Sequence, residues 1–179
     1  MDIKAFVLEQ GADGAGWIKT EKLPIDFALR AACEENVCGS LGKTYACPPL
    51  AGTVEEVAAR ARGYEDFLLF QTIGQLEDSF DVEGMALAGE KHKVLTRAIH
   101  DALYKDMPGL LMLSAGGCDL CADCTAAENE PCRCPERVIP SMSAYCIQVS
   151  KAAALAGMKY NNGVNTVTYF GGIFIPKGQ

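Results

Sequence analysis

The sequence predicts a mixed α/β (α+β) protein, in which helices pack on a mixed sheet and two cysteine-rich loops bind metal. Short apolar runs typical of buried strands alternate along the chain with segments of helical periodicity. Hydrophobic residues make up 49% of the 179 residues, which is enough for a core without disulfides. No internal repeat or low-complexity linker divides the chain, so we expect a single domain over residues 1–179.

Five apolar runs are the predicted strands. They cover residues 3–9, 17–20, 66–73, 109–115 and 165–175, the last as a strand or a hairpin. The glycine-rich residues 11–16 could be mistaken for a phosphate-binding loop. Their spacing does not match the dinucleotide fingerprint, and a strand rather than a helix follows them. A loop or hairpin is therefore the better interpretation.

Four segments are predicted to be helices, covering residues 25–35, 53–63, 82–105 and 141–157. Pro24 suits the start of the first helix. Thr53 and Glu56 form a capping-box pattern at the start of the second, and Gly63 suits its end. Ser141 is the expected cap of the last helix, which should end at Gly157. Its expected apolar face consists of Met142, Tyr145, Cys146, Val149, Ala152 and Ala153.

Charge and cysteine content narrow the function. The formal net charge is −7, with no basic run, which argues against nucleic-acid binding through phosphates. No apolar stretch is long enough to span a bilayer, and the N-terminus does not resemble a signal peptide. We therefore expect a cytoplasmic protein without a membrane partner. In that reducing compartment, nine clustered cysteines indicate metal or redox chemistry rather than disulfides.

The strongest motif lies in the segment of residues 116–140. Cys118, Cys121 and Cys124 are separated by two residues each, and Cys132 or Cys134 can supply a fourth thiolate. Three closely spaced thiolates with a fourth further along are typical of a 4Fe-4S cluster. Zinc is the alternative metal, although structural zinc sites usually combine two separated Cys-x-x-Cys pairs.

An earlier loop contains Cys33, Cys38 and Cys47 among Gly and Pro residues. Three thiolates can hold a second 4Fe-4S cluster with one iron left open, or part of a zinc site. The spacing alone is not diagnostic, so unligated thiols remain an alternative.

Four further residues attract attention for their chemistry. We interpret Cys146 as a small buried hydrophobe, and His92 and His100 as ordinary helix residues, because neither histidine has a metal-binding partner at i+4. Arg133 lies between two cysteines. It is either a cation that stabilises an anionic cluster or a solvated surface residue.

These motifs together resemble those of a known family. They are Cys33, Cys38, Tyr45-Ala46-Cys47-Pro48-Pro49, the Cys118, Cys121 and Cys124 run, Pro131-Cys132-Arg133, Pro135 and Pro140-Ser141-Met142. The chain resembles, over most of its length, the predicted metal-binding proteins numbered 2284 among the domains of unknown function. The resemblance implies metal binding but no reaction. It also implies that Cys132, which follows Pro and precedes Arg, is the fourth late ligand, with Cys134 an addition in this chain.

Three functions remain compatible with the sequence. The first is an iron–sulfur protein for electron transfer or cluster-based redox chemistry in anaerobic metabolism. The second is an enzyme that uses an open cluster on Cys33, Cys38 and Cys47 as a Lewis acid or sulfur acceptor. The third is a zinc-binding interaction module or metal carrier. The expected partner is a redox protein or a small-molecule substrate.

Overall fold

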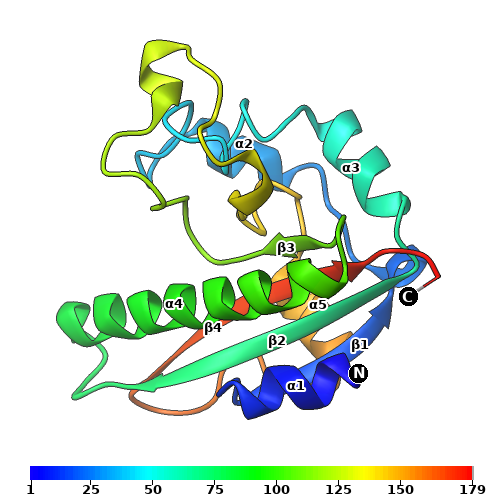
Figure 1. Cartoon of the computed structure of the whole chain (residues 1–179). Helices are drawn as coiled ribbons and strands as arrows, with labels where there is room; N and C mark the ends of the chain where they lie inside the picture. The colour runs from blue at the N-terminus through cyan, green and yellow to red at the C-terminus, as the bar shows by residue number, and fades with distance from the viewer. Residues whose placement is uncertain (179) are drawn as a thin grey trace.

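The computed structural model describes residues 1–178 and contains a four-stranded sheet in the order β1-β2-β4-β3. Neighbouring strands pair antiparallel, and β2 and β4 form the long central ladder (Figure 1). The strands are β1 (Gly14–Lys19), β2 (Asp66–Gln75), β3 (Leu111–Leu113) and β4 (Thr166–Ile175). The helices are α1 (Ile3–Glu9), α2 (Leu29–Glu34), α3 (Val54–Arg62), α4 (Val82–Asp106) and α5 (Val149–Leu155). The predicted α/β class is confirmed.

Both faces of the sheet are covered. Leu68 and Phe70 of β2 belong to a core cluster with residues of α1 and α4. Phe67 and Leu69, on the opposite face of the same strand, belong to a second cluster with residues of α3 and α5. This alternation follows from the two-residue period of a strand, and it explains the continuous apolar run in the sequence.

The glycine pair in β4 allows the aromatic rings of β2 to lie flat on the sheet. The ring of Phe70 covers Gly171 and the ring of Phe67 covers Gly172, so closely that an added Cβ would overlap ring carbons. The absence of a side chain at these positions is therefore a packing requirement.

The first predicted strand is wrong, because residues 3–9 form helix α1. The Asp2 carboxylate accepts a hydrogen bond from the Ala5 amide at 3.1 Å and caps the helix. Ile3, Phe6 and Val7 lie on one helical face, which packs against the core beneath the sheet. Their i, i+3, i+4 spacing is helical, and the short length of the run concealed it.

Two predicted helices are shorter than expected. The helix predicted for residues 25–35 is confined to α2, and the one predicted for residues 141–157 is confined to α5. Residues 24–26 and 146–148 pair with each other instead, through an Ile25–Ile147 bridge and a 2.8 Å bond from the Gln148 amide to the Pro24 carbonyl. Cys146 adopts a positive φ of 54°, which is incompatible with a continuing helix.

The other predicted elements lie close to their expected positions. Thr53 and Glu56 exchange both capping-box hydrogen bonds at the start of α3, and Gly63 ends that helix. The long helix α4 and strands β1 to β4 match the predicted segments within a few residues. Within residues 1–178, no helix has the length and hydrophobicity needed to cross a bilayer.

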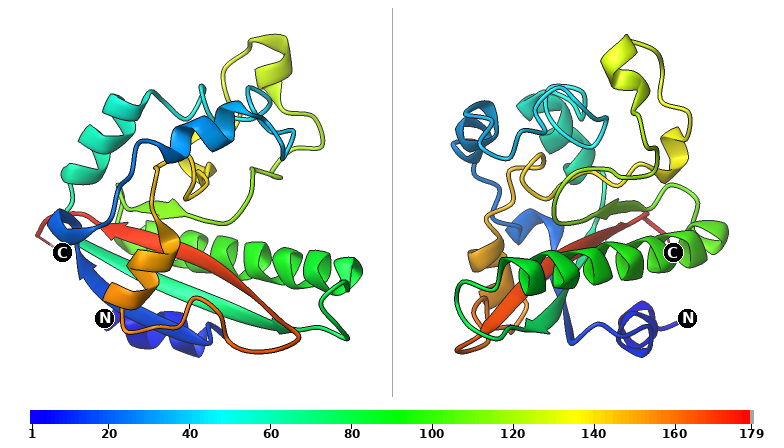
Figure 2. Two further views of the ribbon diagram at one scale, coloured as in Figure 1. Left: turned by 180° about the vertical axis from the view of Figure 1, so that it is seen from behind. Right: turned by 90° about the vertical axis from the view of Figure 1, so that its left-hand side faces the viewer.

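The two cysteine loops lie together beyond the edge strand β3, away from α1 (Figures 1 and 2). Backbone bonds connect them to the sheet. The Ser114 carbonyl, just after β3, accepts from the Met142 amide at 2.9 Å, and the Ala46 carbonyl accepts from the Ser141 amide at 3.1 Å. The segment around Ser141 therefore joins the sheet edge to the loop that carries Cys47.

Candidate metal centre

The two cysteine loops contact each other directly. A Cβ added at Gly117 would lie 3.7 Å from the Sγ atom of Cys47, so the backbone before Cys118 lies against an early cysteine. The Tyr45 hydroxyl donates a 2.6 Å hydrogen bond to the Glu130 carbonyl of the late loop. The two predicted cysteine sites are thus neighbours.

The late cysteines surround one small cavity of about 20 Å³. Its lining includes all five cysteines of the late segment, namely Cys118, Cys121, Cys124, Cys132 and Cys134. No carboxylate or imidazole is among the described residues that line it, so the available donor atoms are dominated by thiols. The geometry leaves the choice between Cys132 and Cys134 as a prediction, because both reach the same cavity.

The late loop is anchored to α4 by charge. Asp119 accepts from Arg97 at 2.7 Å and lies 3.5 Å from the Lys93 ammonium. Arg133 donates to the Asp123 carbonyl at 3.2 Å and also lines the small cavity. Arg97 and Arg133 are therefore close to the late thiols and oppose the build-up of negative charge that several thiolates would create, although Asp119 offsets part of the charge of Arg97.

Burial raises the pKa of the Cys118 thiol, and the Leu120 amide and the Arg97 guanidinium act in the opposite direction. Without a metal, this thiol is therefore protonated at neutral pH. Metal binding at such a site releases a proton, since the thiolate is the ligand form.

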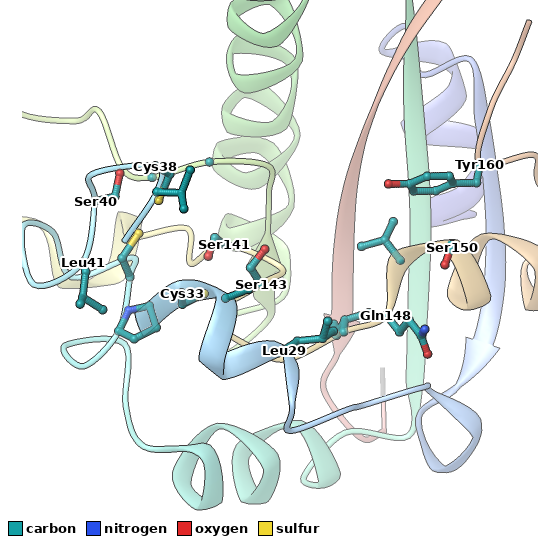
Figure 3. A pocket seen from close by; sticks show the side chains of 18 residues that line it. Leu29, Cys33, Cys38, Ser40, Leu41, Ser141, Ser143, Gln148, Ser150 and Tyr160 are labelled. Atoms are coloured by element: carbon teal, nitrogen blue, oxygen red, sulfur yellow. The ribbon is translucent and has the colours of Figure 1, made fainter. Parts of the chain in front are cut away.

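The early cysteines line a second and much larger cavity, of about 720 Å³ (Figure 3). Cys33 lies on α2, Cys38 is exposed in the following loop, and Cys47 is buried further along. The same cavity is bordered by Gly117 of the late loop. The structure thus brings all three early cysteines to one space, and the metal centre expected on them stays a prediction.

A buried arginine positions the helix that carries Cys33. Arg30 is only 7% exposed, and its guanidinium donates to the Ala144 carbonyl at 2.9 Å and to the Gly52 carbonyl at 3.1 Å. These two bonds join α2 to the turn before α5 and to the segment before α3. The cation also lowers the pKa of Cys33, although burial has the larger effect and raises it.

Cys47 is the most enclosed of the three early thiols. Burial raises its pKa, and the neighbouring hydroxyl of Thr44 and, to a smaller extent, that of Ser141 act against this. Cys38 is close enough to raise the pKa of both Cys33 and Cys47 through unfavourable charge interactions. Three thiolates in this space therefore need a cation to neutralise them.

The thiols line shared cavities without converging on a single point. Within residues 1–178, no three side chains of His, Cys, Asp or Glu form a ready-made ligand group for one metal ion. All nine cysteines are free thiols. The chemistry of the donor set nevertheless suits soft-ligand centres, since clustered thiolates select zinc, copper(I) or iron–sulfur clusters over hard cations.

The remaining candidates do not line the two cysteine cavities. Cys146 is fully buried in the turn before α5, in agreement with its interpretation as a core residue, although it lies close enough to Cys33 to raise the pKa of that thiol. His92 is fully buried, and its Nδ1 lies 2.9 Å from the Thr72 hydroxyl. His100 stacks on Tyr104 and contacts Asp101. Neither histidine is among the residues that line the two cysteine cavities.

Sequence reasoning missed three supporting residues. Arg30 and Arg97 each lie close to a cysteine site, and Tyr45 lines the late cavity although it belongs to the early loop. The i, i+4 pair of cations Lys93 and Arg97 on one helix was a usable signal. The role of Arg30 could not be predicted from the sequence, because its partners are backbone carbonyls that are distant along the chain.

Five thiols around one small cavity, with guanidinium groups beside them, make this a cysteine-rich protein whose donor atoms suit a soft metal centre. A family model described as predicted metal-binding protein (DUF2284) matches residues 16–175. The chain belongs to this family, as the resemblance noted from the sequence implied. No curated protein and no solved structure gives a significant match to the chain.

Proposed function

We propose that this chain is a cytoplasmic iron–sulfur protein that carries a 4Fe-4S cluster on Cys118, Cys121, Cys124 and Cys132. The observation that carries the proposal is the lining of the small late cavity, where five thiols and one guanidinium are accompanied by no carboxylate or imidazole. Two consecutive Cys-x-x-Cys spacings followed by a more distant cysteine support iron–sulfur over zinc.

When bound, such a cluster supplies one-electron redox chemistry. The residues of the chain would hold it and adjust its charge. Arg97 brings positive charge to the Cys118 side, partly offset by its ion-pair partner Asp119, and Arg133 brings positive charge from within the loop. The partner that we propose for electron exchange is a redox protein.

A second function is supported by a separate observation. The three early cysteines border a cavity of about 720 Å³, far larger than a closed structural metal site requires. With three protein ligands, a metal centre on Cys33, Cys38 and Cys47 would retain an open position, which distinguishes catalytic from structural metal sites. In this arrangement Gly117 would separate the two centres, and the late cluster would exchange electrons with the open one.

The test uses protein purified without oxygen. We expect a brown protein that contains acid-labile sulfide and bleaches on addition of dithionite. The late ligand set is then checked with two neighbouring variants: Cys132→Ser should lose the late cluster, and Cys134→Ser should retain it. The reverse result would reassign the fourth ligand. Stoichiometric zinc in a colourless preparation would replace the proposal by the zinc-binding alternative, an interaction module or metal carrier.

A further inference from the structure

The cavity at the early cysteines is large enough for an organic ligand. At about 720 Å³ it falls within the roughly 300–1,000 Å³ range of small-molecule sites. Figure 3 shows Cys33 and Cys38 at one end of the lining, and Ser150 and Tyr160 at the other. The cavity therefore extends well beyond the thiols, and a metal centre there would occupy only one end of it.

The lining carries no formal charge apart from the thiols. Eighteen residues line the cavity, and none of those described is Lys, Arg, His, Asp or Glu. The nearest buried cation, Arg30, is engaged by the Gly52 and Ala144 carbonyls. A charged ligand would find no counter-ion among these residues, and any hydration that it loses here would be uncompensated. The cavity thus selects against ions of either sign at its far end.

The walls between the two ends combine apolar and neutral polar groups. Leu29, Ile147 and Val149 supply apolar surface, and the Gln148 amide and the Ser150 hydroxyl can donate or accept hydrogen bonds. At the far end Tyr160 stacks on Phe170, with ring centroids 5.7 Å apart and an angle of 9° between the planes. This stacking fixes a flat aromatic wall in an otherwise exposed loop.

From this arrangement we infer that the cavity is the binding site for an elongated, uncharged organic molecule. Its apolar or aromatic part lies between Leu29 and Tyr160, hydroxyl or amide groups contact Gln148 and Ser150, and its other end faces Cys33, Cys38 and Cys47. The inference deepens the open-site function proposed above, and it rests on that function only in placing the ligand end against a metal centre.

The test compares three probes of nearly equal shape and different charge: 4-phenylbutanamide, 4-phenylbutanoate and 4-phenylbutylamine. Binding to the anaerobically purified protein is measured by equilibrium dialysis. The amide should bind with an affinity at least about tenfold above that of either charged analogue, because only the ions lose hydration uncompensated. Equal binding of all three, preference for an ion, or no binding of the amide would overturn the inference.

Two variants of α5 locate the bound probe. Ser150→Trp places an indole within the cavity and should reduce amide binding by about tenfold or more. Leu155→Trp adds the same indole to an exposed position on another face of the same helix, outside the lining, and should leave binding unchanged. Unchanged binding in Ser150→Trp would contradict the assigned location. Circular dichroism of both variants checks that they fold, and the charge selectivity of the unaltered protein is a test by itself.

Iron content of the same preparations separates the proposed open metal centre at the early cysteines from the inferred organic ligand. Metal at the early cysteines with no amide binding would leave the open-site function standing and overturn the inferred ligand. Selective amide binding without metal at the early cysteines would support the inferred ligand and overturn the open-site function.

Discussion

The Sγ atom of Cys47 lies 3.7 Å from the position that a Cβ would occupy at Gly117, the residue before the predicted cluster motif begins at Cys118. Two loops separated by about seventy residues of sequence therefore meet at one point. Cys47 and Gly117 both line the large cavity of the early thiols, and the next residue along the chain, Cys118, lines the small cavity of the late thiols. Any metal centres on the two loops would be close enough to influence each other.

The Tyr45 hydroxyl is the second connection between the loops, and its removal should weaken the late site. Tyr45→Phe loses the 2.6 Å bond to the Glu130 carbonyl and should destabilise the loop by about 1 kcal/mol. We expect faster release of metal to a chelator, with little change in the global unfolding midpoint. Tyr104→Phe removes a hydroxyl outside both cavities and serves as the control. Equal release rates in the two variants would contradict the role of Tyr45.

Arg30 should be the residue most needed to position the early cysteines. Arg30→Met keeps the apolar stem but leaves the Gly52 and Ala144 carbonyls without their donor, which should cost roughly 3 kcal/mol. Urea unfolding measures this loss. Arg62→Met alters an exposed arginine on α3 and should change the free energy of unfolding by less than about 0.5 kcal/mol. A similar small effect at Arg30 would show that α2 is held by other contacts.

Folding stability should fall in acid because of His92. Burial lowers the pKa of His92 to about 4 in the folded protein, against 6.5 for a solvent-exposed histidine in the unfolded chain. The unfolded chain therefore binds the proton more readily. The stability that depends on the neutral imidazole is present above pH 6.5 and is lost as pH falls toward 4. Between pH 7 and pH 5 this amounts to about 2 kcal/mol.

The measurement is urea unfolding of metal-free protein at both pH values, with His92→Phe as the matched variant. The variant should show a pH dependence smaller by the same amount, because only the histidine is removed. Parallel pH dependences would mean that the pKa of His92 in the folded protein lies close to its value in the unfolded chain, which would contradict the effect of burial.

Metal removal should loosen residues 116–140 more than the sheet. In this segment the described structure has only the short 3-10 turns Thr125–Glu128 and Pro135–Arg137, and few of its residues are buried. Metal-free protein should keep its helical circular dichroism and become sensitive to trypsin at Arg133 and Arg137, because metal binding is coupled to local folding. Identical digestion of the two forms would contradict this.

The sequence predicted elements that local rules determine. The Thr53 and Glu56 capping box and the buried run of β2 were readable because their signals are contained within a few residues. The clustering of cysteines is also a local signal, but it does not separate Cys132 from Cys134, which line the same cavity.

The errors arose where distant contacts override local pattern. Residues 141–148 have a helical apolar pattern, yet pairing of 146–148 with 24–26 holds them in a turn with Cys146 at positive φ. Residues 3–9 resemble a strand in composition, but their apolar face packs as a helix under β1 and β2. The contact between Gly117 and Cys47 has no local signal, because it depends on how both loops leave the sheet edge.

The central claim is that the two loops hold two iron–sulfur centres, and iron counting tests it most directly. Iron and acid-labile sulfide are measured per chain in protein purified without oxygen, beside the variants Cys33→Ala, Cys38→Ala and Cys47→Ala. The account predicts about eight irons in the unaltered chain and about four in each variant, from the composition of cubane clusters. About four irons in every sample would show that the early cysteines hold no cluster. Zinc in place of iron in every sample would contradict the account as a whole.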